Sequence, residues 1–508
     1  MKIGSRNFPA FQLERLNHSL ALLTDLYQLT MAYAYWKSGL KDQEAVFHLY
    51  FRRNPFQGGF SVACGLEYVL GFLQALQFTT EETGYLAKLK GNDDRPLFPQ
   101  EFLDYLLGMQ FSCDVDAIPE GTIIFPQEPM LRVQGPILQC QILETPLLNM
   151  INFQTLIATK AARVLIAARG EPVLEFGLRR AQGIDGALAA SRAAYIGGCA
   201  GTSNVLAGQL FGIPVKGTHA HSWVMVFEDE LESFRAYAEA MPNNCIFLVD
   251  TYNSLHGVRR AVEVGHWLQQ QGHKMIGIRL DSGDLAYLSI EARKILDAAG
   301  FRDAVIVASN DLDEHIITSL KEQQAAINVW GVGTKLVTAY EEPALGGVYK
   351  LSALRGASGP WVYKVKLSEQ GMKITTPGRH QIRRFFSERE FLADIIYDLD
   401  LGISDGCTLV DPMDLTRRKH IPPGTEYHDL LVPVFRRGQL VYTPPSIDES
   451  RGKVQEQLAR FHSGIKRFVN PHQYPVGLEQ RLHDLRTKLI LKARGVSTDE
   501  ITQPLGWH

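Results

Sequence analysis

Short apolar runs recur between residues 172 and 338, and each run ends in polar or glycine-rich residues. Stretches with helical periodicity separate the runs, which are 172–183, 213–222, 245–254, 274–285, 304–314 and 327–338. An alternation of this kind predicts parallel strands joined by crossover helices. At least six such units over roughly 170 residues favour a closed β/α barrel over an open sheet.

The N-terminal part of the chain has a different pattern, which predicts an α+β domain. Residues 22–37 show helical periodicity, with Thr24 or Asp25 as the N-cap. Residues 121–136 contain two short apolar runs with turn residues between them, and they predict two strands.

The most apolar long stretch, residues 142–168, contains Glu144, Lys160 and Arg163. These charges predict a buried helix and argue against a membrane span. We therefore expect no membrane partner.

The chain becomes Pro-rich and charged after residue 380, with helical signals at 453–468 and 477–493. This change predicts an extension packed on the rest. We expect three consecutive parts: an N-terminal α+β domain at 1–145, an α/β barrel catalytic domain at 146–380 and a C-terminal extension at 381–508.

Composition adds limits on compartment and partners. At 45% hydrophobic and 21% charged residues, the chain is typical of a soluble globular protein. Its net charge of −3, without a long Lys/Arg run, gives no reason to expect a nucleic-acid partner. Six cysteines without a C-x-x-C pair argue against a zinc ribbon or a disulfide framework and fit a reducing cytosol. The N-terminal residues 1–28 have no long apolar region, so we expect a cytoplasmic protein without a secretory signal.

Residues suited to chemistry stand at the ends of the apolar runs. Arg279 and Asp281 end one run, Asp250 ends another, and Phe176 and Arg179 follow the first. In β/α barrels the carboxyl ends of the strands build the active site. Arginine binds a carboxylate or phosphate with two parallel hydrogen bonds, and aspartate suits sugar hydroxyls or Mg²⁺. The plainer alternatives are an internal Arg–Asp ion pair, a helix cap at Asp250, and a core Phe beside solvated arginines.

A glycine turn follows the last run. Gly331, Gly333 and Thr334 would let backbone N–H groups and a hydroxyl approach an anion, and loops after the last barrel strands often bind phosphate. A simple tight turn explains the same residues equally well. Neither a G-x-x-x-x-G-K-[ST] phosphate loop nor a G-x-G-x-x-G dinucleotide pattern occurs.

Two histidines, His219 and His221, stand two residues apart after another run. On a strand they would share one face, which suits a metal site. However, no third ligand is clearly placed, and Gly217 indicates a turn. These residues alone do not separate a catalytic histidine from a histidine in a polar loop.

The chain resembles the nicotinate phosphoribosyltransferase family. The matching stretches lie in family order over residues 22–351: "LLTDLYQLTMAYAYW", "FRRNPFQGGF", "EFGLRRAQGIDGALAASRAAYIGGCAGTSNVLAGQLFGIPVKGTHAHSW", "FLVDTYNS", "IGIRLDSGDL" and "GVGTKLVTAYEEPALGGVYKL". The resemblance implies a type II phosphoribosyltransferase fold, in which an N-terminal α+β domain packs on an irregular α/β barrel. It also implies a homodimer whose two sites are each built from both subunits.

The resemblance further implies an ATP-coupled ligase of NAD biosynthesis. The expected substrates are nicotinate, phosphoribosyl pyrophosphate and ATP, with Mg²⁺ as cofactor and nicotinate mononucleotide as product. In the family pattern G-T-x-A-H the histidine after Ala becomes phosphorylated. That histidine is His221 here, and His219 takes the variable position.

The same resemblance implies the substrate contacts. The nicotinate ring is expected to stack between Phe176 and Tyr27 of the partner subunit. The other expected contacts are Thr218, Arg279 and Arg179 near the ring, Asp250 and Asp281 at the ribose and Mg²⁺, and Gly333 with Thr334 at phosphoribosyl pyrophosphate. Asp250 is also a candidate to orient the ring of His221.

Several other functions remain open. Nicotinamide phosphoribosyltransferases resemble this chain at "GTSN" but have Asp where this chain has Ser203, and a carboxylate there would repel nicotinate. Quinolinate phosphoribosyltransferases are shorter, use no ATP and bind a dicarboxylate with more basic residues. An unrelated barrel enzyme on a sugar phosphate and a catalytically inactive relative are the remaining alternatives.

Overall fold

The computed structural model describes residues 20–356 and 359–496, which form two compact units. The barrel unit comprises Leu156–Pro343 and Ile447–Gln455, and the outer unit takes the described parts of Met1–Thr155, Ala344–Ser446 and Glu456–His508. By packing, the C-terminal residues therefore share a unit with the N-terminal residues. The three consecutive domains stay a prediction, and most of the N-terminal segment considered for a secretory signal lies outside the described residues.

The barrel unit is built on a six-stranded sheet in which all neighbours are parallel. Its strand order is β7 (Gly201–Thr202), β6 (Val173–Glu175), β11 (Val329–Val332), β10 (Val305–Ala308), β9 (Gly277–Leu280) and β8 (Ile246–Leu248). Five of the six predicted runs form strands. The run at 213–222 does not, and β7 was not predicted. Within residues 20–356 and 359–496 no strand pairing joins β7 to β8, so the barrel is irregular.

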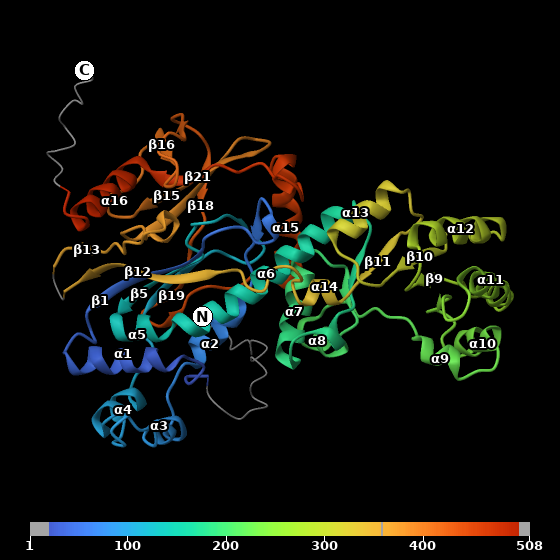
Figure 1. Cartoon of the computed structure of the whole chain (residues 1–508), viewed down its shortest axis with the longest axis horizontal. Coiled ribbons are helices and arrows are strands. Elements are labelled where there is room, and N and C mark those ends of the chain that lie inside the picture. The colour runs from blue at the N-terminus through green and yellow to red at the C-terminus, as the bar shows by residue number, and fades with distance from the viewer. Residues whose placement is uncertain (1–19, 357–358, 497–508) are drawn as a thin grey trace, which may run out of the picture. The chain divides into compact units, whose positions relative to one another are not determined.

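Helices follow the strands of the barrel unit in alternation. They are α7 (Ile184–Ile196), α8 (Val205–Phe211), α9 (His221–Met225), α10 (Glu230–Ala240), α11 (Ser254–Gln270), α12 (Leu285–Ala298), α13 (Glu314–Glu322) and α14 (Thr334–Val337), with a 3-10 turn η3 (Leu178–Arg180). Asn204, Asn253, Asp284 and Asp313 accept backbone N–H groups at the starts of α8, α11, α12 and α13. These caps begin a helix soon after each strand. Figure 1 shows α11 and α12 beside β9, which both helices contact.

The outer unit contains two larger sheets and one small one. The first sheet is antiparallel, in the order β13 (Val362–Tyr363), β12 (Gly347–Arg355), β1 (Glu44–Phe51), β5 (Leu131–Pro136), β3 (Asp114–Ala117), β19 (Val432–Arg436) and β20 (Gln439–Leu440). The second runs β17 (Arg418–Ile421), β16 (Cys407–Val410), β21 (Val476–Glu479), β15 (Phe391–Asp398), β14 (His380–Phe386) and β18 (Tyr427–Asp429). The small sheet pairs β2 (Ser61–Val62) with β4 (Ile123–Ile124).

The helices of the outer unit confirm several sequence predictions. They are α1 (Leu26–Lys37), α2 (Leu66–Ala75), α3 (Thr80–Leu86), α4 (Gln100–Leu107), α5 (Ile137–Ile142) and α16 (Gln480–Ala493), with short turns η2 (Pro55–Gln57), η4 (Gly371–Lys373) and η5 (Ser463–Lys466). Helix α1, its N-cap Asp25, and the strands β4 and β5 were predicted. The strands of the C-terminal part were not predicted from the sequence.

Two helices, α6 (Glu144–Ala168) and α15 (Ile447–Arg460), contribute residues to both units. As predicted, α6 is a buried helix. Its charged residues Lys160 and Arg163 lie 2.7 and 2.8 Å from the carboxylate of Glu314 on α13, so both buried cations are paired with the same anion. Among the described residues no helix is long and apolar enough to cross a membrane.

A stacked histidine pair is buried in the outer unit. The rings of His48 on β1 and His380 on β14 lie 4.1 Å apart at 11°, and His48 Nε2 accepts the backbone N–H of His380. Burial lowers the pKa of both rings, that of His380 to about 4, and the nearby Arg132 lowers both further, while Asp398 acts in the opposite direction on His380. Both rings are therefore neutral in the folded protein.

We predict that this pair makes the protein less stable in mild acid. Its contribution to the free energy of unfolding is complete above the unfolded pKa of about 6.5 and is lost as the pH falls towards 4. The reason is that the histidines of the unfolded chain bind protons at pH values where the folded rings stay neutral. A depression of this size corresponds to roughly 3 kcal/mol for one group. His48→Gln keeps an acceptor and removes one titration, so its urea midpoint should fall less than that of the wild type between pH 7 and 4.5. Parallel curves for the two proteins would contradict this prediction.

Candidate active site

Arg279, the third residue of β9, joins residues from three other parts of the barrel unit. Its Nε donates to Ser309 Oγ at 2.7 Å, its Nη1 to Thr218 Oγ1 at 3.0 Å and its Nη2 to Asp281 Oδ1 at 2.7 Å. The guanidinium carbon lies 5.8 Å from the centre of the Phe176 ring. Parallel strands in register place Arg279, Ser309 and Phe176 at one edge of the sheet, as predicted for the strand ends, and Thr218 reaches them from a loop.

Asp250, two residues beyond β8, forms a second junction. Its Oδ1 lies 3.1 Å from His221 Nε2, and its Oδ2 accepts the backbone N–H of Asp281 at 2.8 Å and the hydroxyl of Ser282 at 2.7 Å. The side chain of Asp250 is 1% exposed, whereas that of His221 is 37% exposed. A carboxylate can only accept, so His221 Nε2 carries the hydrogen in this contact.

Asp281 belongs to both junctions and stays ionised. Burial by itself would raise the pKa of this carboxyl group, but hydrogen bonds from Ser309 and Arg279, together with the charge of Arg279, hold the pKa below its ordinary value. Its Oδ1 receives these two hydrogen bonds. The side chain remains 26% exposed, which leaves Oδ2 accessible.

The ring of Phe176 lies against a glycine of the neighbouring strand β11. A Cβ atom on Gly331 would come within 2.8–2.9 Å of two ring carbons of Phe176 and 3.3 Å from Ser309 Cβ. The backbone N–H of Phe176 donates to Val332 O at 2.8 Å, which continues the strand pairing. The close approach therefore needs glycine at 331, and Gly331 sets the position of the ring.

A buried carboxylate supports the loop that carries Phe176. Glu175 accepts from the backbone N–H of Gly177 and from the hydroxyls of Ser191 at 2.8 Å and Thr202 at 2.5 Å. Its backbone oxygen accepts the N–H of Ser203 at 2.9 Å. This network fixes the ends of β6 and β7 relative to each other, and it places Ser203 on a partly exposed bend beside them.

Two further predicted residues lie at the start of α14. Gly333 is its N-cap and Thr334 its first residue, and both are partly exposed. A Cβ on Gly333 would lie 3.1 Å from Phe176 O. Arg179, in contrast, is exposed on η3, and within the described part of the chain no hydrogen bond or ion pair joins it to the Arg279 group.

His219 is buried, although its neighbour His221 is half exposed. Its Nε2 accepts the backbone N–H of Leu248 at 3.2 Å, and its Nδ1 lies 3.3 Å from Ala220 O. Burial lowers its pKa to about 4, and the charge of Arg279 adds to this effect. The ring is therefore neutral, with its hydrogen on Nδ1.

Metal ligation is limited by what these carboxylates already bind. Throughout the described residues no group of three or more His, Cys, Asp or Glu side chains is placed to hold a metal ion. Both oxygens of Asp250 have hydrogen-bond partners, while Asp281 Oδ2 is accessible. One carboxylate fits an ion such as Mg²⁺ that keeps several waters and binds substrate phosphates.

Tyr27 belongs to α1 of the outer unit and is 47% exposed. Its pKa is raised by partial burial and by the charge of Glu144.

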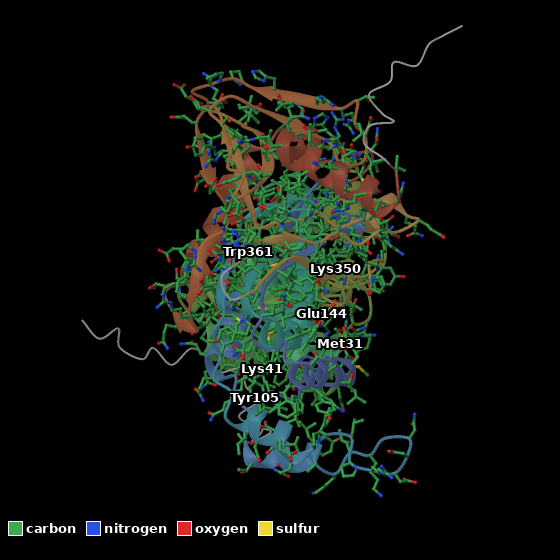
Figure 2. All side chains as sticks on the ribbon, turned by 90° about the vertical axis from the view of Figure 1, so that its left-hand side faces the viewer. Met31, Lys41, Tyr105, Glu144, Lys350 and Trp361 are labelled. Carbon is green, nitrogen blue, oxygen red and sulfur yellow. The ribbon has the colours of Figure 1, made fainter. Side chains whose placement is uncertain are left out.

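Glu144 Oε1 lies 3.8 Å from Lys350 Nζ, and Figure 2 labels both side chains. Burial lowers the pKa of Lys350, and the charges of Arg52 and Lys366 lower it further.

Sequence reasoning missed two residues that hold the group together, Ser309 and Glu175, and it did not predict the role of His219. Ser309 does end an apolar run, so the strand-end rule contained a signal for it. Glu175 is the last residue of β6 and was not singled out, although it too ends a strand. The role of His219 depends on a donor 29 residues away, which no local pattern reveals.

Comparison with known proteins matches almost the whole chain. Models of the nicotinate phosphoribosyltransferase N-terminal domain, the nicotinate phosphoribosyltransferase family and its C-terminal domain match residues 22–152, 172–376 and 379–486. Nicotinate phosphoribosyltransferase of Bacillus subtilis (strain 168) is 43% identical over 490 residues, which cover 93% of this chain and 97% of that protein. The Dictyostelium discoideum nicotinate phosphoribosyltransferase is 40% identical over 522 residues, covering 91% and 87%.

A solved structure agrees with these matches. The crystal structure of human nicotinic acid phosphoribosyltransferase superposes with a TM-score of 0.79 at 34% identity, covering 92% of this chain and 99% of that chain. This confirms the predicted type II phosphoribosyltransferase fold. The chain belongs to the nicotinate phosphoribosyltransferase family.

Proposed function

We propose that this protein joins nicotinate to the ribose of phosphoribosyl pyrophosphate and couples this step to ATP hydrolysis. The product is nicotinate mononucleotide, a precursor of NAD. The observation that carries the proposal is the joined group at the strand ends, where Arg279 lies beside Phe176 and His221 lies on Asp250. The site supports a reaction in which the pyridine nitrogen displaces pyrophosphate from the anomeric carbon.

Arg279 and Phe176 suit a planar aromatic anion. A guanidinium has five N–H donors, and Ser309, Thr218 and Asp281 take three of them. The two that remain can bind the carboxylate of nicotinate while the pyridine ring stacks on Phe176. Three fixed contacts hold the guanidinium before substrate arrives, which lowers the entropy cost of orienting the ring.

His221 is the proposed acceptor of a phosphoryl group from ATP. Asp250 holds the Nε2–H, so the lone pair of Nδ1 attacks the γ-phosphorus and ADP leaves. The carboxylate of Asp250 also stabilises the positive charge that the ring gains. Water later takes the phosphoryl group, which couples ATP hydrolysis to nucleotide formation.

Asp281 is the residue that fits Mg²⁺ best, through Oδ2 and together with the phosphates of the substrate. The bound ion would neutralise charge on the departing pyrophosphate. Asp250, also predicted at the ion or the ribose, acts in this proposal by orienting His221 and the backbone of Asp281. Gly333 and Thr334 supply backbone and hydroxyl donors for phosphoribosyl pyrophosphate, and exposed Arg179 is free to approach it or the ring.

Nicotinate is preferred to nicotinamide in this proposal. Ser203 places a hydroxyl at the bend after β7, where an Asp would repel a carboxylate. The matched relatives named above are all nicotinate phosphoribosyltransferases. They favour the nicotinate reaction over the nicotinamide alternative.

We further propose a cytoplasmic homodimer in which Tyr27 of the partner subunit completes each ring site. The exposure of Tyr27 on α1 suits a role at a subunit contact. All six cysteines are free and buried, which suits a reducing compartment.

The proposal predicts which substrates are used. With phosphoribosyl pyrophosphate and Mg²⁺, nicotinate should be converted to the mononucleotide and ATP should raise the rate. Nicotinamide should be converted at least about a hundredfold more slowly, because its neutral amide cannot form the ion pair that the nicotinate carboxylate forms with Arg279. Chromatography of the product from parallel reactions, each with and without ATP, measures both effects. Preference for nicotinamide, or no turnover of either substrate, would overturn the proposal.

Replacement of His221 should separate ATP use from synthesis. His221→Asn should take up no phosphate from γ-labelled ATP and lose all stimulation by ATP, while the slow ATP-independent synthesis persists. His266→Asn replaces an exposed histidine on α11 and serves as the control, which should behave like the wild type. Stimulation of His221→Asn by ATP would contradict the phosphohistidine assignment.

Filling the space beside Phe176 should weaken nicotinate binding. Gly331→Ala must displace the ring, and overpacking of this kind costs about 1–3 kcal/mol. The KM for nicotinate should rise roughly tenfold or more, with little change in phosphate uptake by His221. Gly186→Ala on α7 adds a Cβ in open space and is the matched control. An unchanged KM in Gly331→Ala would show that the ring does not contact the substrate.

A further inference from the structure

The run at 213–222 lies between β7 and β8, the two edge strands of the six-stranded sheet. On one side, Val215 forms an isolated parallel bridge with Thr202 of β7, where the N–H of Lys216 donates to Thr202 O at 2.9 Å. On the other side, His219 accepts the N–H of Leu248 in β8. The segment thus contacts β7 through its backbone and β8 through a side chain.

The Leu248 N–H is not used in the pairing of the sheet, because β8 is an edge strand. β8 pairs with β9 alone, and the N–H of Val249 takes part in that pairing by donating to Arg279 O. Successive N–H groups of a strand point in opposite directions, so the N–H of Leu248 points away from β9. The imidazole of His219 provides the acceptor that a neighbouring strand would otherwise supply.

The ring of His219 is held firmly in place. Its centre lies 4.9 Å from that of Tyr237 and 6.1 Å from that of Phe234, both on α10, and the residue is 8% exposed. Trp223 Nε1, on the following helix α9, donates to Ser233 O at 3.0 Å on the same helix α10. His219 and Trp223, which precede and follow His221 in the sequence, therefore both contact α10.

Two contacts with the same spacing align this segment with the end of β8. His219 meets Leu248 and His221 meets Asp250, and each pair is separated by 29 residues. The first contact is a neutral hydrogen bond to backbone, and the second orients the reactive ring. Loss of the first contact would leave His221 held by its own side chain and by α9 alone.

We propose that His219 is a positioning residue, whose neutral Nε2 fastens the loop to β8 and so aligns His221 with Asp250. The proposal deepens the proposed function and rests on phosphorylation of His221. The part of His219 that matters is the acceptor at Nε2. A side chain that keeps an acceptor at that distance should preserve the alignment, and one that keeps only the ring should not.

The test compares two variants of the full-length protein. His219→Phe keeps an aromatic ring against Tyr237 and loses the acceptor, whereas His219→Gln keeps an acceptor in its amide oxygen. His266→Phe, at an exposed site on α11, is the control for adding a phenyl ring. For each protein we would measure phosphate uptake from γ-labelled ATP, the kcat and KM for nicotinate with ATP, and amide hydrogen exchange in β8.

We expect His219→Phe to take up phosphate about ten- to a hundredfold more slowly, because small misplacements of reacting groups have effects of that order. Its ATP-stimulated kcat should fall in parallel, while the KM for nicotinate changes less than about threefold. Exchange at the Leu248 amide should speed up. His219→Gln should recover most of the rate and of the protection, and His266→Phe should match the wild type.

Other outcomes overturn the proposal in distinguishable ways. Wild-type phosphate uptake by His219→Phe, or equal impairment of the Gln and Phe variants, would refute the positioning role and leave the proposed function intact. A wild-type protein that takes up no phosphate would refute the ATP-coupled function, and the positioning role with it. Slow uptake with unchanged Leu248 exchange would show that the acceptor at Nε2 is not the cause.

Discussion

The parallel alignment of the strands in the barrel unit is the constraint on which the candidate site depends. Because all six strands end at one edge, residues from distant parts of the chain reach the same place. Arg279 and Asp250 then convert this proximity into fixed geometry, since each makes three polar contacts: Arg279 contacts Ser309, Thr218 and the nearby Asp281, and Asp250 contacts His221, Asp281 and Ser282. Asp281 belongs to both junctions and links them through its side chain and its backbone N–H.

Buried charges in both units are kept by pairing. Glu314 pairs with both Lys160 and Arg163 in the barrel unit, and Arg384 binds Asp394 in the outer unit with neither side chain exposed. Removing one partner of such a pair typically costs about 3–5 kcal/mol, because the other charge is left buried and unpaired. Glu175 is satisfied by neutral donors instead, and it supports the loop that carries Phe176. Both oxygens of this buried carboxylate therefore accept hydrogen bonds beside the loop.

The two neighbouring histidines show how strongly environment decides chemistry. His219 is buried, accepts a hydrogen bond from backbone and has a pKa lowered to about 4 by that burial. His221, two residues on, begins a short helix, stays half exposed and donates to a buried carboxylate. Residues 216–220 form no strand, so the two rings do not share one face of a strand. The same pair of residue types therefore provides one structural acceptor and one candidate nucleophile.

The sequence by itself determined the local elements and the residues at their ends. Apolar runs and helix caps such as Asp25 depend on neighbours in the chain, so five strands, α1 and the strand-end positions of Arg279, Asp281 and Asp250 followed from the pattern. Only the tertiary structure decided which elements pair. The two-residue strand β7, the packing of His380 on His48 from 332 residues away and the acceptor role of His219 all depend on which edge groups remain unpaired once the sheets form. That property belongs to the assembled fold, because a backbone donor is free or paired only in relation to a strand that is distant in the chain.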